Sequence, residues 1–373
     1  MSSETIAQLL QGVSHVTWQS VVMIIVACVL FYLGIAKDYE PLLLLPIGAG
    51  AILANLPLSP LMNDDGMLKI LYNSGIENEL FPLLIFVGIG ALTDFGPLLE
   101  NPRMVLLGAA GQFGIFITLI LALLFGFTRN EAASIGIIGA IDGPTSIYVS
   151  GLLAPHLLGP ITVAAYSYMS LVPIIMPPIM RALTTKKERQ IRMPYSQRFI
   201  SQRTRVMFPI VVTVLVGTLV PFATPLIGML MLGNFMRESK AVERLTGASS
   251  NELANIVTLF LGLAVGSTMV GDKFLTVSTL WILILGIFAF GLDTVAGLMF
   301  AKLLNLLSGG RFNPLIGAAG ISAFPMAARV VQRVAQEEDF ENFLLMHAMG
   351  ANAAGQVASV VAGGVLLALM NAG

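Results

Sequence analysis

Long uncharged, apolar stretches separated by short polar segments make up most of the chain. A helix needs roughly 20 apolar residues to cross a bilayer, and several stretches are long enough for one span. Stretches 143–180 and 342–373 can hold more than one element, whereas 80–93 is too short for a simple span. Continuous apolar runs disfavour a β-barrel, whose strands alternate. The pattern predicts an all-α polytopic membrane protein with about nine to twelve helical elements, some incomplete. The stretches are residues 21–36, 41–63, 80–93, 104–128, 143–180, 206–236, 253–271, 274–292, 312–328 and 342–373.

Composition supports the same class. Hydrophobic residues make up 56% of the 373 residues and charged residues only 11%, against about 25% charged in an ordinary globular domain. This excludes a disordered chain and argues strongly against a soluble enzyme. The net charge of −1 and the absence of a basic domain argue against a nucleic-acid binder. The single cysteine, Cys28, allows neither a disulfide framework nor a cysteine metal cluster.

A basic insertion at residues 181–205 divides the chain into two halves. By the positive-inside rule, this loop lies in the cytoplasm. Each half ends in a segment rich in Gly, Pro and small polar residues, and IGA at 138–140 aligns with IGA at 316–318. Paired interrupted segments of this kind mark the binding site of a secondary transporter built from inverted repeats. We therefore expect N-terminal membrane helices in residues 1–80, a first repeat in 81–180, the basic loop in 181–205, a second repeat in 206–341 and a C-terminal membrane helix in 342–373.

Asp142 is the sharpest candidate for a site. It stands in GAIDGPT at residues 139–145, where Pro144 disfavours helix at Gly143 and so interrupts the segment. A carboxylate at membrane depth costs at least ~2.5–3.5 kcal/mol, a cost that a bound cation or proton would offset. Carbonyl oxygens freed at the break are hard ligands suited to Na⁺. The alternative is a carboxylate in a solvent-exposed loop at a membrane edge.

The corresponding segment of the second half runs from Asn313 to Ser322. Asn313 and Ser322 supply neutral oxygens, and Gly317 allows close backbone approach. Asn313 could equally be a helix cap. Beyond it, Arg329 could bind a carboxylate bidentately or extend to a membrane interface.

Four other polar residues have competing interpretations. Tyr166 and Tyr168 are either interfacial anchors or proton relays. Asn352 could bind a ligand or hydrogen bond between helices. Asp293 lies either near a membrane edge or at a second ion or proton site.

The chain resembles the β subunits of the sodium-pumping, biotin-dependent decarboxylases of oxaloacetate, methylmalonyl-CoA and glutaconyl-CoA. The resemblance covers nearly the whole chain. Its motifs are GALTDFGPLL at 90–99, GAIDGPT at 139–145, YSYMSLVP at 166–173, GAAGIS at 317–322, PMAAR at 325–329 and LMHAMG at 345–350. The chain departs from the family pattern at Met176, where Gln is expected, and at Ala351, where Pro is expected.

The resemblance implies an enzyme subunit of the bacterial or archaeal cytoplasmic (inner) membrane that decarboxylates carboxybiotin, consumes a proton and exports Na⁺. It implies four kinds of partner: a carboxyltransferase subunit, a biotin carrier protein, a small single-span membrane subunit and further copies of the chain. The alternative is a secondary transporter for Na⁺ or a small anion, without decarboxylase chemistry.

The same resemblance implies roles for individual residues. Asp142, Asn313, Gly317 and Ser322 would bind Na⁺, with Ser322 also handling protons. Tyr168 would act with Asp142, and Arg329 and Asn352 would serve carboxybiotin, Arg329 by holding its carboxylate. No role for Asp293 follows from the resemblance, because no acid is expected at that position.

Overall fold

The computed structural model describes residues 11–194 and 199–372, and within these ranges all regular secondary structure is helical. This confirms the predicted all-α class; the inverted repeat remains a prediction. The first half contains α2 (Gln11–Ser14), α3 (Trp18–Lys37), α4 (Pro41–Asn55), α5 (Met67–Tyr72), α6 (Leu80–Leu92), α7 (Gly96–Glu100), α8 (Met104–Ala110), α9 (Phe113–Leu124), α10 (Arg129–Gly136), α11 (Gly143–Leu153) and α12 (Leu158–Leu183).

The second half follows a short helix in the basic loop, α13 (Lys186–Arg189). It contains α14 (Gln202–Leu219), α15 (Thr224–Ser239), α16 (Glu243–Ala248), α17 (Ala254–Ser267), α18 (Gly271–Phe274), α19 (Val277–Leu307), α20 (Met326–Glu338) and α21 (Leu345–Asn371). Short 3₁₀ segments η3 (Ile137–Ala140) and η7 (Pro314–Gly320) precede α11 and α20.

Six helical stretches of the described part are long and apolar enough to cross a membrane, and a bent pair at residues 41–77 could be a seventh. The bent pair turns by 106° between α4 and the segment after it. Large apolar side chains remain exposed along the spanning helices, such as Ile25 and Val29 on α3 and Ile287 and Phe288 on α19. An exposed apolar surface of this extent fits contact with lipid, so the chain is a multi-pass membrane protein.

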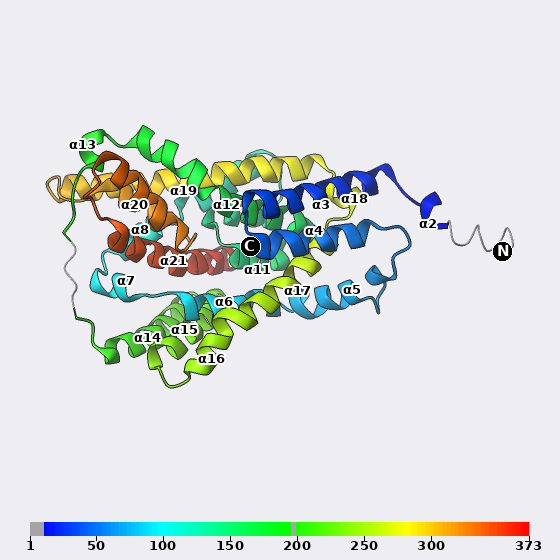
Figure 1. Cartoon of the computed structure of the whole chain (residues 1–373), viewed down its shortest axis with the longest axis horizontal. Coiled ribbons are helices and arrows are strands. Elements are labelled where there is room, and N and C mark those ends of the chain that lie inside the picture. The colour runs from blue at the N-terminus through cyan, green and yellow to red at the C-terminus, as the bar shows by residue number, and fades with distance from the viewer. Residues whose placement is uncertain (1–10, 195–198, 373) are drawn as a thin grey trace.

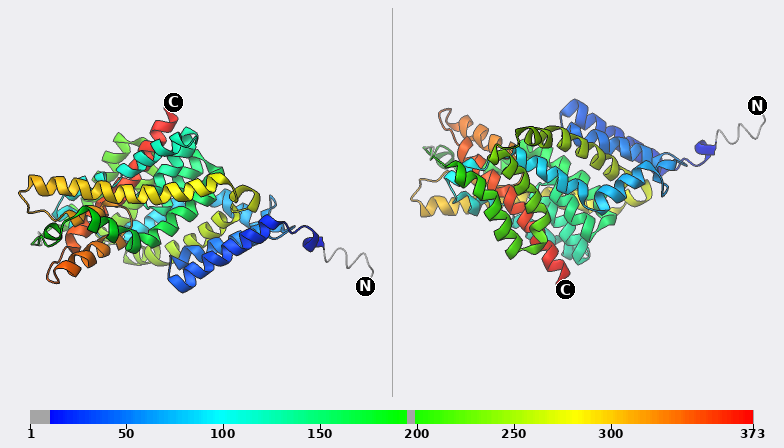
Figure 2. Two further views of the ribbon diagram at one scale, coloured as in Figure 1. Left: turned by 90° about the horizontal axis from the view of Figure 1, so that it is seen from above. Right: turned by 90° about the horizontal axis from the view of Figure 1, so that it is seen from below.

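Helix α13 of the basic loop and helix α2 lie at opposite ends of the molecule (Figure 1). At the loop end are α7, α13 and α20, whereas α2, α5 and α18 lie towards the other end (Figure 1). Figure 2 shows α3 and α4 along one flank and the C-terminal end of α21 on the opposite flank.

Two apolar clusters form the interior. The larger is built on α8 to α12, α14, α15 and α19 to α21, and the smaller on α3, α4, α6 and α17. Small residues let backbones touch within them: a Cβ on Gly297 of α19 would lie 2.2 Å from the carbonyl oxygen of Gly317 in η7. Such close contacts replace the hydrophobic effect as the source of helix association in lipid.

Candidate functional site: a buried carboxylate at a helix interruption

Asp142 lies at the junction between η3 and α11. Ile141 has a left-handed backbone (φ 52°), an uncommon conformation for a β-branched residue, and this turns the chain between the two elements. Asp142 is the N-cap of α11, and its Oδ1 accepts a hydrogen bond from the Thr145 N–H at 3.3 Å. The carboxylate is only 3% exposed. The structure thus places it inside the protein, which contradicts the solvent-exposed loop considered above.

The second oxygen of Asp142 contacts two serines from other parts of the chain. Ser322 Oγ donates to Oδ2 at 3.2 Å, and Ser359 Oγ lies at 2.9 Å from the same atom. The two hydroxyls are 3.1 Å apart. The Ser322 N–H also donates to the carbonyl of Ala140, at 3.2 Å. The interrupted segments of the two halves therefore meet at Asp142.

Side-chain amides hold the backbone after η7 in place. Asn352 Nδ2 donates to the Ile321 carbonyl at 2.6 Å, and Gln356 Nε2 to the Ser322 carbonyl at 3.0 Å. Gln112, in the break between α8 and α9, donates to the Gly320 carbonyl at 3.3 Å. The carbonyl oxygens of all three side chains are buried and have no hydrogen-bond partner in the described part of the chain. They are hard, neutral oxygens on side chains that contact residues 320–322, the segment that carries Ser322.

A cavity of about 420 Å³ reaches Asp142 from between the two apolar clusters. Ser322, Gln356 and Tyr166 line it, and the half-buried Glu40 lies on its wall. The Tyr166 ring packs directly on the backbone after Asp142, because a Cβ on Gly143 would lie 2.0 Å from the ring carbon Cζ. Glycine at position 143 is therefore required by this contact.

Tyr168 points in a different direction. Its hydroxyl donates to the Leu283 carbonyl of α19, and its ring lies against Gly286. It belongs to the larger apolar cluster, whereas Tyr166 belongs to the smaller one. Among the described residues, Tyr166 rather than Tyr168 lines the Asp142 cavity.

Asn313 and Gly317 are separate from the Asp142 carboxylate. Asn313 begins η7, where its Nδ2 donates to the carbonyls of Arg189 and Ile191 at 3.0 and 2.8 Å. Its Oδ1 accepts from the Leu315 N–H, as in a helix cap. Gly317 packs on Gly297 in the middle of η7. Residues 313–322 thus connect the basic loop to the carboxylate.

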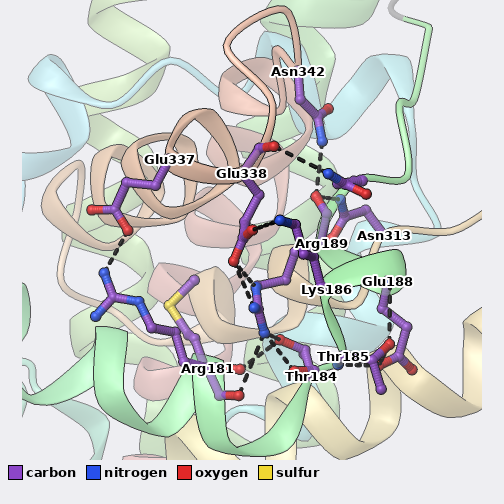
Figure 3. A network of polar contacts seen from close by, with 12 residues as sticks. Arg181, Thr184, Thr185, Lys186, Glu188, Arg189, Asn313, Glu337, Glu338 and Asn342 are labelled. Carbon is purple, nitrogen blue, oxygen red and sulfur yellow. Dashed lines mark hydrogen bonds and ion pairs between the residues drawn. The ribbon is translucent and has the colours of Figure 1, made fainter.

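The basic loop is paired with the acidic end of α20 (Figure 3). The Arg189 guanidinium contacts the Glu338 carboxylate at 2.6 Å, and Arg192 contacts Asp339 at 2.6 Å. The hydrogen-bonded Arg192 holds the pKa of Asp339 below its ordinary value of 3.8.

Glu188 closes the same loop onto α19. Partial burial disfavours its charge, but the Thr185 N–H and hydroxyl and the Lys302 ammonium outweigh this and hold the pKa of Glu188 below its ordinary value of 4.5. The Lys302 nitrogen lies 3.4 Å from the Glu188 carboxylate. Arg181, Arg189 and Arg192 of the loop therefore form ion pairs that hold the loop end together.

The structure places Arg329 and Asp293 away from the contacts of Asp142 described above. Arg329 is exposed on the second turn of α20, and no ion pair is found for it within the described ranges. Asp293 lies near the middle of α19, fully buried, with Oδ1 accepting from the Gly114 N–H.

Sequence reasoning missed three residues of this polar region, namely Gln112, Gln356 and Ser359. A usable signal was present on α21. Asn352, Gln356 and Ser359 are spaced by four and then three residues, which places them on one face of a helix. Polar residues repeating on one face of a spanning helix indicate a polar interior.

Fold and site together define an α-helical membrane protein with a buried carboxylate at a helix interruption, an arrangement typical of ion translocation. The family described as the Na⁺-transporting oxaloacetate decarboxylase beta subunit matches residues 19–370. The chain is 53% identical to the methylmalonyl-CoA decarboxylase subunit beta of Propionigenium modestum, over 94% of each chain. It is 52% identical to the glutaconyl-CoA decarboxylase subunit beta of Acidaminococcus fermentans, over 95% of this chain and 94% of that one. It is 48% identical to the oxaloacetate decarboxylase beta chain of Klebsiella pneumoniae, over 98% of each.

The chain belongs to the family of β subunits of the Na⁺-transporting decarboxylases. This confirms the resemblance read from the motifs and the class of enzyme subunit that it implied.

Proposed function

We propose that the chain decarboxylates carboxybiotin, delivered on a carrier protein, and couples this reaction to Na⁺ export. The observation that carries the proposal is the Asp142 carboxylate, buried at a helix interruption and contacted by Ser322 and Ser359. Membership of the family supports the decarboxylation reaction, and the geometry around Asp142 supports an ion-binding site there.

The residues around Asp142 fit Na⁺. The ion favours hard oxygen ligands, and the site offers the carboxylate oxygen, two hydroxyls and the unpartnered side-chain oxygen of Gln356, which lines the same cavity. The cavity gives an approach to the carboxylate. In this proposal Asp142, Ser322 and Ser359 hold the transported ion, while Gly317 and Asn313 keep the second interrupted segment in register.

Arg329 serves the carboxybiotin carboxylate. It is exposed, and it follows Pro325, which lines the cavity, by one helical turn. A guanidinium can hold a carboxylate through two parallel hydrogen bonds. Asn352 contributes by holding the Ile321 carbonyl, and with it the cavity wall, in position. We assign Ser322 to proton transfer because its hydroxyl contacts both Asp142 Oδ2 and the Ser359 hydroxyl.

Coupling follows from competition for one site. Moving one Na⁺ against the membrane potential costs about 2.3 kcal/mol per 100 mV, so decarboxylation must be prevented unless the ion moves. A proton and Na⁺ cannot both occupy Asp142 Oδ2. Release of Na⁺ on the far side frees the carboxylate for the proton that decarboxylation consumes. Tyr168, which joins α12 to α19 through the Leu283 carbonyl, would hold the two helices together as the site changes access.

The proposed assembly has four parts besides the lipid bilayer. A carboxyltransferase subunit loads biotin on a carrier protein, the carrier meets the loop end of this chain, and a small single-span subunit and further copies of the chain complete the complex. The membrane is the bacterial or archaeal cytoplasmic membrane, with the basic loop inside.

The test uses the assembled complex in sealed vesicles with radiolabelled Na⁺ and free carboxybiotin. We expect CO₂ release to require Na⁺ and to move the label, and Asp142→Asn to stop both. Asp38→Asn, an exposed acid outside the cavity, is the matched control and should behave as wild type. Retained coupled turnover in Asp142→Asn would refute the site. Na⁺ movement unaffected by carboxybiotin would instead identify a plain secondary transporter.

A further inference from the structure

A second carboxylate is buried in this protein, apart from the Asp142 cavity. Asp293 lies on α19 and is 0% exposed. Its Oδ1 accepts the hydrogen bond from the Gly114 N–H in the first turn of α9, so half of the carboxylate faces the positive end of a helix dipole. Asp293 does not line the Asp142 cavity.

The other oxygen, Oδ2, has no hydrogen-bond partner in the described part of the chain. It points at η3, where a Cβ on Gly139 would lie 2.5 Å from it. An unpartnered carboxylate oxygen in a dry interior is costly, because burial removes the water that would solvate the charge. The N-terminus of α9 offsets the desolvation cost of Oδ1, which accepts the Gly114 hydrogen bond, but not that of Oδ2.

Within the described ranges, no ion pair to a basic side chain is found for Asp293. The helical elements with the most contacts to α19 are α8, α9, α10, α12, η3 and η7. Their charged side chains are engaged elsewhere or lie outside the interior, and Tyr166 of α12 lines the Asp142 cavity. The Tyr168 hydroxyl donates to Leu283. Arg181, at the end of α12, pairs with Glu337, and Glu131 in α10 pairs with His156.

Gly139 connects this carboxylate to the first site. It lies in the same 3₁₀ segment as Ala140, whose carbonyl accepts from Ser322, and both precede Asp142. A change in charge or size at Asp293 Oδ2 would therefore displace the backbone of η3, which positions Asp142.

We propose that Asp293 is a second monovalent-cation site, where Oδ2 takes Na⁺ or a proton and its occupancy is coupled through Gly139 and Ala140 to ion loading at Asp142. The proposal goes beyond the function above and rests on it only in taking Na⁺ as the ion. Both occupants supply the same chemistry, a single positive charge on a buried carboxylate oxygen.

The experiment measures ions directly and needs no carboxybiotin. Purified complex is compared as wild type, Asp293→Asn, Asp142→Asn and Thr294→Val by equilibrium dialysis with radiolabelled Na⁺ and by infrared difference spectra on Na⁺ addition. Asn keeps an oxygen for the Gly114 N–H while removing the charge. Thr294 is the matched control, since it is the next residue, is equally buried and bonds only within α19. Size-exclusion chromatography checks folding, and Asp293→Ser replaces Asn if that variant fails.

Two results support the proposal and identify the occupant. If Asp293→Asn binds one Na⁺ fewer per chain, the occupant is Na⁺. If the Na⁺ count is unchanged but a carboxylic-acid band that responds to Na⁺ disappears, the occupant is a proton. The proposal is overturned if neither the count nor any Na⁺-responsive band depends on Asp293, which would make it a fixed, silent acid. The proposed function fails on a different observation, coupled turnover by Asp142→Asn.

Discussion

Replacing Ser359 by alanine tests the geometry of the Asp142 site at a residue that the sequence did not reveal. Its hydroxyl lies 2.9 Å from Asp142 Oδ2 and 3.1 Å from Ser322 Oγ, and the residue is fully buried. Alanine removes one oxygen atom and leaves the helix unchanged. If this hydroxyl supports the ion-binding form of the carboxylate, the variant should fold normally but bind Na⁺ less tightly.

The expected size follows from the bond that is lost. A hydrogen bond to a charged group contributes about 1.5–3 kcal/mol. At about 1.4 kcal/mol for each tenfold change, this raises the Na⁺ concentration for half-maximal decarboxylation by roughly 10- to 100-fold. The rate at saturating Na⁺ should fall much less, because the carboxylate and Ser322 remain.

The assay is the Na⁺ dependence of carboxybiotin decarboxylation by the complex in vesicles. The matched control is Ser150→Ala, which removes another fully buried hydroxyl whose bonds go only to carbonyls of its own helix, such as that of Ser146 at 2.6 Å. A Ser359→Ala variant with the Na⁺ dependence of wild type, in a protein that folds normally, would show that the hydroxyl contact plays no part in ion binding.

Three further results are expected. Gly143→Ala should abolish Na⁺-coupled turnover and lower the midpoint of thermal unfolding, since a Cβ would overlap the Tyr166 ring; forcing atoms into a packed core costs about 1–3 kcal/mol. Arg189→Ala should destabilise the complex to heat by about 1–3 kcal/mol through loss of charged hydrogen bonds, whereas the exposed Lys187→Ala should not. Glu188→Gln should lower the thermal unfolding midpoint at neutral pH. The pKa of Glu188 is lower in the folded protein than its ordinary value of 4.5, so the charged carboxylate stabilises the folded state above pH 4.5. This stabilisation is lost as the pH falls through the pKa of the folded state. A difference between wild type and Glu188→Gln that persists in acid would contradict this assignment.

The interruption at Asp142 could be predicted because its causes are local. Pro144 disfavours helical backbone angles at Gly143. An acidic side chain in an apolar stretch is energetically costly, which marks it as a functional candidate. Aligning the two halves singled out the segment that carries Ser322 as a second candidate region. Neither argument depends on knowing how the helices pack.

The contributions of α21 could not be found in the same way. Ser359 and Gln356 lie in a long regular helix of small residues, without a break to draw attention to them. Which face of that helix meets Asp142 depends on helix packing. The same holds for the two tyrosines of α12. Residues two apart on a helix point in nearly opposite directions, so whether Tyr166 or Tyr168 meets the cavity is decided by tertiary structure.

The basic loop shows a different limit of sequence reasoning. Its charges were interpreted only as a signal of membrane orientation. In the structure, Arg189 and Arg192 also bind the acidic end of α20, and Asn313 donates to the carbonyl of Arg189. Pairing between positions about 150 residues apart cannot be read from either segment alone.

These contacts give α20 two fixed ends. Its start follows Phe324 and Pro325, which line the Asp142 cavity, and its end carries Glu338, paired with the basic loop. At about 1.5 Å per residue, the helix spans roughly 20 Å between them. A negatively charged group that displaced Glu338 from Arg189 would therefore release the far end of a rigid rod whose near end forms the cavity wall. The segment from Asn313 to Ser322 makes a second connection between the same two places. Under the proposed function, carrier docking at the loop end and ion loading at Asp142 would therefore be connected through α20, the helix that also carries Arg329.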